Sequence, residues 1–304
     1  MRKILRVLSF IVVMAMVLGG CSIVELDDVV VSTQSPAGDN KIQIPTDGTE
    51  APEATEELNT VEEQVLLEQD GVKVTLREYV KDSFYGEGLK ILVENTSDKN
   101  IGIQCNAVIV NNYMIVDFFS CSVAAGKKAN ETIYLLSTEL EAAGIENIGQ
   151  IELYFNVYNS DTFATIFESD CITVQTSAYA EMDVTPFDGG TELYNQNGIR
   201  IVGTIVDENS FWGSAVLLYL ENTSNDNVII SCEDMSINGF MVNGYLYSTI
   251  YAGKMAIDEI IIFQTDLDEN DIKSVEEIEL AFHIFNAETF WEIAKTEPIK
   301  FSVG

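Results

Sequence analysis

Residues 65–76 read VLLEQDGVKVTL. A run over 65–69 that begins with three apolar residues stops at Asp70-Gly71, after which Val72, Val74 and Leu76 alternate with polar residues. A period of two is typical of a strand with one buried face. Asp-Gly is typical of tight hairpin turns, because its residues accept positive φ. The stretch therefore predicts an antiparallel β-hairpin.

Further short apolar runs follow, separated by turn-forming residues, and only residues 138–143 look helical. After residue 105 the alternation changes parity by one residue, which predicts a β-bulge near Asn106-Ala107. Eight or so short strands with turns about every ten residues favour an antiparallel β-sandwich. The runs lie at residues 89–94, 101–105, 116–123, 129–136, 151–158, 163–167 and 172–174.

The same pattern occurs twice, because residues 70–174 align with residues 197–301 at an offset of 127 without a gap. A repeat of this length exceeds a solenoid unit, so each copy is expected to be a domain. We predict one sandwich over 65–176, a linker over 177–191 and a second sandwich over 192–304. The motifs Glu-Asn-Thr-Ser (94–97 and 221–224), Ala-Gly-Lys (125–127 and 252–254) and Ile-Glu-Leu (151–153 and 278–280) recur in both copies.

Residues 1–20 combine a basic start with an apolar run of about a dozen residues, which is typical of a secretory signal peptide. Leu18-Gly19-Gly20-Cys21 resembles the lipobox of bacterial lipoproteins. The resemblance implies cleavage before Cys21 and a lipid on its thiol, which would hold the protein on the outer face of the bacterial cell membrane. A signal peptide without lipidation is the alternative. The acidic, Pro- and Thr-containing stretch up to residue 64 is expected to be a disordered tether.

The lipobox, the tether and the duplicated module together resemble surface lipoproteins of Gram-positive gut bacteria. Their modules are described as immunoglobulin-like or telokin-like and are of unknown function. The resemblance implies an all-β chain with two tandem antiparallel immunoglobulin-like β-sandwich domains. It also implies an extracellular binding, adhesion or scaffolding role in the cell envelope, and it carries over no catalytic residue.

The charge of the chain argues against nucleic acid as a partner. Lys and Arg number 16 against 49 Asp and Glu, a net charge of −33, whereas nucleic acids are held by basic residues on their phosphates. The single histidine, His283, aligns with Asn156, so we expect it to be a structural or surface residue. We expect no cofactor, no metal and no enzymatic activity. An acidic stretch over 266–271 could hold calcium, but a solvated helical face is the favoured interpretation.

Two alternatives to a binding protein stay open. Glu152 and Glu279 occupy equal positions and could serve a carboxylate-dependent glycan or cell-wall hydrolase. We expect both to point to solvent, because Ile and Leu flank them on the other face of the strand. Lys127 and Lys254 are expected to lie in turns, where they serve solubility. A purely structural accessory lipoprotein is the other alternative.

Four cysteines follow Cys21. Cys105 and Cys232 are equivalent positions in the two copies, so we expect each to be a buried free thiol. Cys121 and Cys171 are both replaced in the second copy. A disulfide between them and independent replacement are both open.

The candidate ligand contacts are Phe84-Tyr85 and Phe211-Trp212, which lie between two strands at the same place in each copy. Loops on a rigid sandwich often carry binding residues, and aromatic rings can stack on sugars or anchor a protein. The partner would be a glycan or a protein of the envelope. Alternatively, one ring plugs the open end of the sandwich while its neighbour shields it.

Overall fold

A computed structural model describes residues 59–302 except 83, 211 and 212. The described residues belong to one compact unit of almost entirely antiparallel β structure. The predicted signal peptide, Cys21 and most of the predicted tether lie outside the described residues, as do Phe211 and Trp212. None of the helices among the described residues is both long and apolar enough to cross a membrane.

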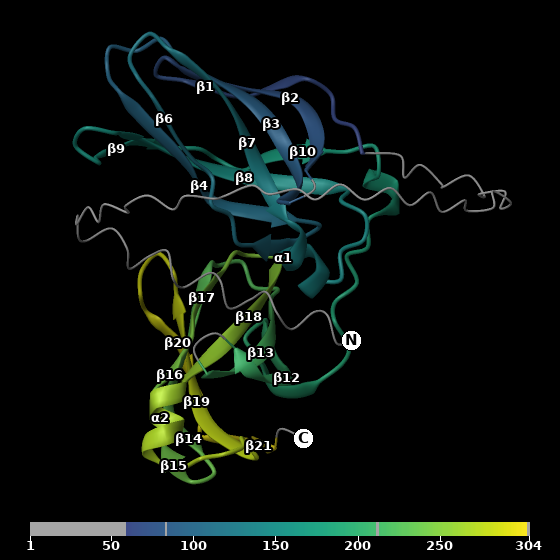
Figure 1. The fold of residues 1–304 in the computed structure, drawn as a ribbon, viewed down its shortest axis with the longest axis vertical. Coiled ribbons are helices and arrows are strands. Elements are labelled where there is room, and N and C mark those ends of the chain that lie inside the picture. Colours follow the sequence, from purple (N-terminus) through teal and green to yellow (C-terminus); the bar gives the residue numbers. More distant parts are fainter. Residues whose placement is uncertain (1–58, 83, 211–212, 303–304) are drawn as a thin grey trace, which may run out of the picture. The chain divides into compact units, whose positions relative to one another are not determined.

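The first repeat is a sandwich of two sheets, drawn in purple to teal in Figure 1. One sheet has the strand order β1-β2-β3-β7 and the other has the order β10-β8-β4-β5, with β6 on β4 and β9 on β8. The bounds are β1 Gln64–Gln69, β2 Val72–Asp82, β3 Gly86–Asn95, β4 Ile101–Val110, β5 Tyr113–Ile115, β6 Ser120–Val123, β7 Lys128–Leu136, α1 Ser137–Ala142, β8 Gln150–Asn159, β9 Thr165–Glu168 and β10 Ile172–Gln175.

The second repeat has the same elements 127 residues later, apart from one short additional strand, β16. Its sheets contain β11-β12-β13-β18 and β15-β14-β19-β20, with β17 on β14, β21 on β19 and β16 on β18. The bounds are η4 Tyr179–Glu181 between the repeats, then β11 Thr191–Gln196, β12 Ile199–Ser210, β13 Gly213–Asn222, β14 Val228–Ile237, β15 Phe240–Met241, β16 Gly244–Tyr245, β17 Tyr247–Ile250, β18 Lys254–Phe263, α2 Gln264–Glu269, β19 Glu277–Asn286, β20 Glu292–Lys295 and β21 Ile299–Ser302.

The all-β sandwich prediction is confirmed, and two of its local details are confirmed with it. Asp70 and Gly71 both have positive φ, 50° and 80°, in the turn that pairs Gln69 with Val72. The register of β4 against β8 shifts between Cys105 and Ala107, where the change of parity predicts a bulge. Each repeat encloses its own apolar core between its two sheets.

The recurring Glu-Asn-Thr-Ser motif is a structural device. Asn95 is buried, and its Nδ2 donates hydrogen bonds to the carbonyl oxygens of Lys99 (2.8 Å) and Val123 (2.9 Å). Asn222 makes the equivalent bonds to Asp226 (2.8 Å) and Ile250 (3.0 Å). A buried amide that satisfies two carbonyls fixes the loop after β3 or β13. The conserved spacing of this motif between the copies is therefore explained by folding alone.

The folded part begins before the predicted end of the tether. The backbone N–H of Thr60 donates to Oγ of Ser177 (3.1 Å), and the N–H of Ser177 donates to the carbonyl of Thr60 (2.9 Å). The predicted linker is also held, because Nη1 of Arg200 donates to the carbonyl of Phe187 (2.9 Å). The domain boundaries at 65–176 and 192–304 remain predictions.

Candidate functional site

Three aromatic rings form a surface at one end of the first repeat. The Tyr85 ring lies 4.8 Å from the ring of Tyr134 on β7, and the Phe84 ring contacts Tyr85 edge-on at 4.8 Å. Phe84 is 81% exposed and Tyr85 is 49% exposed. We call Phe84, Tyr85 and Tyr134 the aromatic ledge. An exposed ring pair at a loop is a surface onto which a sugar ring or an apolar side chain can pack.

The backbone of this loop is fixed by the last residue of β2. Oδ1 of Asp82 accepts hydrogen bonds from the backbone N–H of Phe84 (2.7 Å) and Tyr85 (2.9 Å). These two bonds lower the pKa of Asp82, the bond from Tyr85 contributing most. Because these bonds hold the backbone at Phe84 and Tyr85, a ligand that packs on the two rings would lose little conformational entropy there.

The structure contradicts the alternative in which one ring of this loop plugs the first sandwich. Both Phe84 and Tyr85 lie outside the core, and Tyr85 rests on another surface ring. The sequence offered no means to decide, because a loop of two aromatics can turn either ring inward. For Phe211 and Trp212, which lie outside the described residues, the question stays open.

A second pair of aromatic turns was missed by the sequence analysis. Phe163, between β8 and β9, and its counterpart Phe290, between β19 and β20, are both exposed. Both adopt positive φ, 57° and 56°, a conformation that bulky side chains rarely take. Trp291 beside Phe290 is exposed too. The signal was present in the alignment of Thr162-Phe163 with Thr289-Phe290.

Turn chemistry explains how these phenylalanines are held. Oδ1 of Asn159 accepts from the N–H groups of Asp161 and Thr162, both at 2.9 Å. Oδ1 of Asn286 does the same for Glu288 (3.0 Å) and Thr289 (2.9 Å). The asparagine caps the turn in each repeat and leaves the next ring in solvent.

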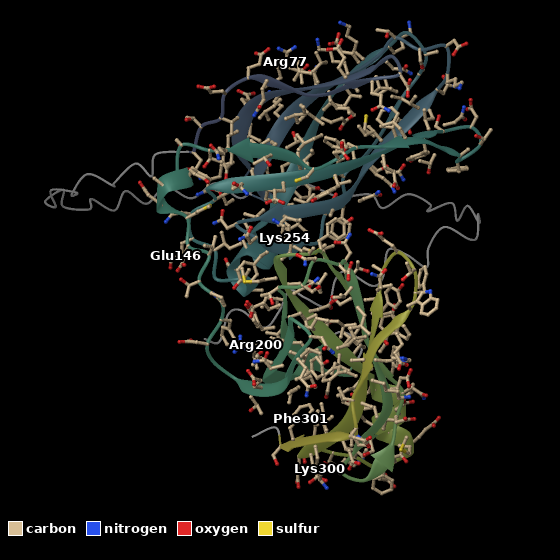
Figure 2. The ribbon with its side chains drawn as sticks, turned by 180° about the vertical axis from the view of Figure 1, so that it is seen from behind. Arg77, Glu146, Arg200, Lys254, Lys300 and Phe301 are labelled. Atoms are coloured by element: carbon tan, nitrogen blue, oxygen red, sulfur yellow. The ribbon has the colours of Figure 1, made fainter. Side chains whose placement is uncertain are left out.

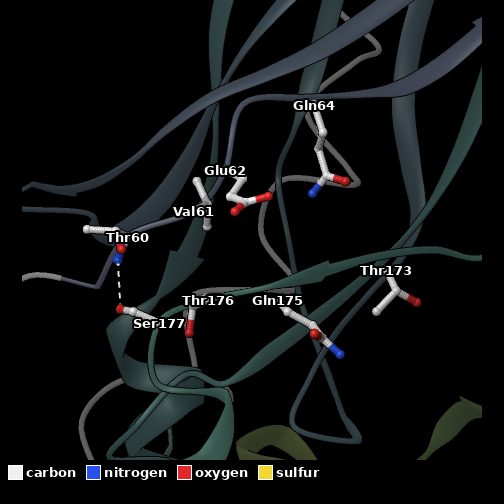
Figure 3. Close-up of a pocket in the computed structure, with 8 residues that line it drawn as sticks. All are labelled: Thr60, Val61, Glu62, Gln64, Thr173, Gln175, Thr176 and Ser177. Carbon is white, nitrogen blue, oxygen red and sulfur yellow. Dashed lines mark hydrogen bonds between the residues drawn. The ribbon is translucent and has the colours of Figure 1, made fainter.

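A polar groove lies between the edge strands β1 and β10 of the first repeat, with a volume of about 670 Å³. Figure 3 shows its lining, where the Thr60 to Ser177 hydrogen bond closes one end. Among the described residues that line it, Glu62 is the one ionisable group, so the groove offers hydroxyl and amide groups but no pair of carboxylates. The lining residues are Thr60, Val61, Glu62, Gln64, Thr173, Gln175, Thr176 and Ser177.

The expectation that Glu152 points to solvent is wrong. Its side chain is buried, and Oε1 lies 2.6 Å from Nζ of Lys254 and 2.9 Å from Nε2 of Gln150. The outer face of β8 is covered by the turn before β18 of the second repeat. Lys254, labelled in Figure 2, is therefore an inter-repeat contact and not only a soluble turn residue. Glu279, the counterpart of Glu152, is half-buried.

His283 has the structural environment expected for it. Nδ1 lies 2.6 Å from Oε1 of Glu233, and Nε2 lies 2.7 Å from Oε2 of Glu292. Lys295 also binds Glu233 (2.5 Å), and the bonds from Lys295 and His283 lower the pKa of that carboxyl group. The histidine thus ties three strands of one sheet together: β14, β19 and β20.

Cys105, Cys121, Cys171 and Cys232 are all free thiols, so the structure contains no disulfide between Cys121 and Cys171. Burial raises the pKa of Cys232 to about 11 and that of Cys105 well above its usual range. Both are half-buried rather than fully enclosed. Sγ of Cys171 instead lies 3.5 Å from Oε2 of Glu152.

No group of three or more possible metal ligands occurs within residues 59–302, leaving aside the positions that are not described. In the acidic stretch, Oδ2 of Asp266 accepts from the backbone N–H of Asn243 (2.7 Å), and Asp268 accepts from Gln264 (2.9 Å). These carboxylates cap local backbone and side-chain groups. Comparison with known protein families and with curated proteins found no match to this chain.

Proposed function

We propose that this protein is a non-enzymatic bacterial lipoprotein that binds a glycan or protein of the cell envelope through exposed aromatic loops. The observation that carries the proposal is the aromatic ledge, in which the exposed Phe84 and Tyr85 have backbone N–H groups bound to Asp82. Exposing clustered aromatic rings to water costs free energy unless a partner covers them. Phe163 and Phe290 repeat the arrangement on other loops.

The envelope location rests on the sequence. Leu18-Gly19-Gly20-Cys21 supports lipidation of Cys21, and two acyl chains or more hold a protein firmly on a membrane. Labelling with a palmitate analogue in the host should mark the wild-type protein and not Cys21→Ala. Equal labelling of both would refute the anchor.

Binding is tested with the unlipidated mature chain and isolated cell walls. The wild-type protein should sediment with the walls, and Phe84→Ala with Tyr85→Ala should lower the bound fraction about tenfold. That loss corresponds to about 1.4 kcal/mol, a modest value for two ring contacts. Phe118→Ala removes another exposed ring, one that belongs to none of these loops, and serves as the control. The aromatic ledge is not the binding site if the double variant binds walls and whole cells as the wild type does.

The carboxylate hydrolase has no observation in its favour among the described residues. Glu152 is bound to Lys254, and a general acid or base must be free to exchange its proton with substrate or water. We therefore propose the binding role alone.

A further inference from the structure

The two repeats are joined by a strand pairing that uses one surface from each. The outer edge of β5 pairs in parallel with the start of β18, placing Tyr113 opposite Met255 and Met114 opposite Ala256. The N–H of Met255 donates to the carbonyl of Asn112 (2.9 Å). Beside this pairing, Nζ of Lys254 lies 2.6 Å from Glu152. The join between the repeats thus combines strand pairing, an apolar contact and one ion pair. We call the β5 edge with Glu152 the accepting surface, and the turn 252–254 with the start of β18 the inserting surface.

The second repeat carries another copy of the accepting surface. Its strand β15 follows a turn, Asn238-Gly239, whose φ values of 51° and 85° match those of Asn111 and Asn112, 47° and 70°. Phe240 and Met241 pair with β14 as Tyr113 and Met114 pair with β4. Glu279 takes the place of Glu152.

This second accepting surface is open. Strand β15 is the edge of its sheet among the described residues, and β14 is its only neighbour there. Phe240 is 49% exposed and Met241 is 65% exposed, whereas Tyr113 in the covered copy is buried. An edge strand with exposed apolar side chains is a template for pairing with another chain.

The first repeat carries another copy of the inserting surface. Its turn Ala125-Gly126-Lys127 is identical to Ala252-Gly253-Lys254, and in both the Gly has a φ near 70°. Lys127 is exposed. Strand β7, which follows, is the edge of the sheet β1-β2-β3-β7 in the described structure. This turn and strand edge therefore have the shape and charge that the accepting surface binds within the chain.

We propose that a second copy of this chain docks head to tail, with the 125–129 segment of one molecule against the Phe240-Met241 edge of the next. The register follows from the join within the chain: Lys128 stands opposite Phe240, Ala129 stands opposite Met241, and Lys127 binds Glu279. The contact is heterologous, because the two surfaces differ, so each added molecule leaves one of each surface free. The product is an open chain of molecules.

The proposed contact between molecules is expected to be weaker than the contact between the two repeats of one molecule. Met255 and Tyr219, two members of the apolar cluster at the join, correspond to Lys128 and Leu92. The internal join also benefits from a covalent link, which gives an effective concentration of order millimolar. The net charge of −33 makes two molecules repel each other at low salt. Assembly is therefore expected at high protein concentration and is promoted by salt, which screens this long-range repulsion.

Sedimentation velocity of the unlipidated mature chain, from about 10 μM to about 1 mM in about 0.5 M NaCl, tests the proposal. The expected result is a concentration-dependent series of species that passes beyond the dimer. Met241→Asp should reduce the association at least tenfold, because it places a charge in the apolar contact. Val65→Asp changes an exposed apolar residue on β1, at the edge of the sheet opposite β7, and should leave the association as in the wild type.

A charge exchange identifies the partner surface. Lys127→Glu and Glu279→Lys should each weaken association, and a chain carrying both changes should recover it, since the pair is restored between molecules. Circular dichroism of each variant separates misfolding from loss of contact. The proposal is overturned if the chain is monomeric at about 1 mM, if Met241→Asp associates as the wild type does, or if the double exchange fails to recover association.

Discussion

Replacing Lys254 with Met removes one partner of the ion pair that joins the two repeats. Nζ of Lys254 lies 2.6 Å from Oε1 of Glu152, and the side chains are 14% and 9% exposed. With an effective dielectric constant of about 20, the attraction at this distance is about 6 kcal/mol. Most of that attraction offsets the cost of removing both charges from water, and leaving one of them buried without its partner costs about 3 to 5 kcal/mol.

We expect Lys254→Met to lower the free energy of unfolding by about 3 kcal/mol, at the low end of that range, because water can enter between the repeats. Urea denaturation measures the change. Both tryptophans of the chain lie in the second repeat, so their fluorescence reports on that repeat, while far-UV circular dichroism reports on both. The midpoint should fall by about 1 to 1.5 M by either probe, and the two transitions should separate as the coupling weakens.

Lys300 and Glu277 provide a matched control, since their atoms are also 2.6 Å apart but their side chains are 56% and 40% exposed. Lys300→Met should cost less than about 1 kcal/mol. Adding Glu152→Gln to Lys254→Met should recover most of the lost stability, because the uncompensated charge is gone. If Lys254→Met costs no more than Lys300→Met, or if the two changes simply add, the join does not depend on this ion pair.

Asn222→Ala should destabilise the protein by about 2 kcal/mol in urea, because the carbonyls of Asp226 and Ile250, the second of them buried, lose their donor. Burial raises the pKa of Asp117 to about 6, so the folded state binds its proton more tightly than the unfolded state. Its contribution to stability is present at pH 4 and below and is lost as the pH rises through 6. As the pH rises from 4 to 7, the free energy of unfolding of Asp117→Asn should therefore increase by about 1 to 2 kcal/mol relative to that of the wild type. Cys105 and Cys232 should resist native alkylation at pH 8, whereas the exposed Cys171 reacts, as mapped by mass spectrometry.

Each of these three predictions would be contradicted by a specific result. An Asn222→Ala protein as stable as the wild type would mean that water satisfies both carbonyls. A pH-independent difference between Asp117→Asn and the wild type would show that this carboxyl group is solvated. Alkylation of Cys105 and Cys232 as fast as that of Cys171 would contradict their burial and raised pKa.

The features that the sequence predicted correctly are the ones set by neighbouring residues. The Asp70-Gly71 turn depends on the φ preferences of two residues, and the bulge between Cys105 and Ala107 depends on the parity of one strand. Both are local, so a period-two pattern contains them. The internal repeat strengthens the inference, because a change of parity that occurs in both copies is unlikely to be chance.

The errors concern surfaces that another part of the chain covers. Alternation along 151–153 correctly predicts that Ile151 and Leu153 are buried in the core of one sandwich. It does not predict what covers the other face of the strand. Glu152 is buried because the second repeat brings Lys254 onto it. The exposed Phe163 was missed for a related reason, since its position is set by a side-chain cap and not by a hydrophobic period.

The two repeats differ most informatively where one copy of a surface is covered and the other is open. In the join, the rings of Tyr154 and Tyr251 meet edge-on at 5.0 Å, and both counterparts, Ala281 and Ala124, lack a ring. An aromatic contact adds about 0.5 to 1.5 kcal/mol beyond the area it buries. The internal join therefore has aromatic reinforcement that the free surfaces lack, although they keep its turn, its edge strand and its charges. In the proposed assembly, this difference would make the contact between molecules weaker than the contact between the two repeats of one molecule.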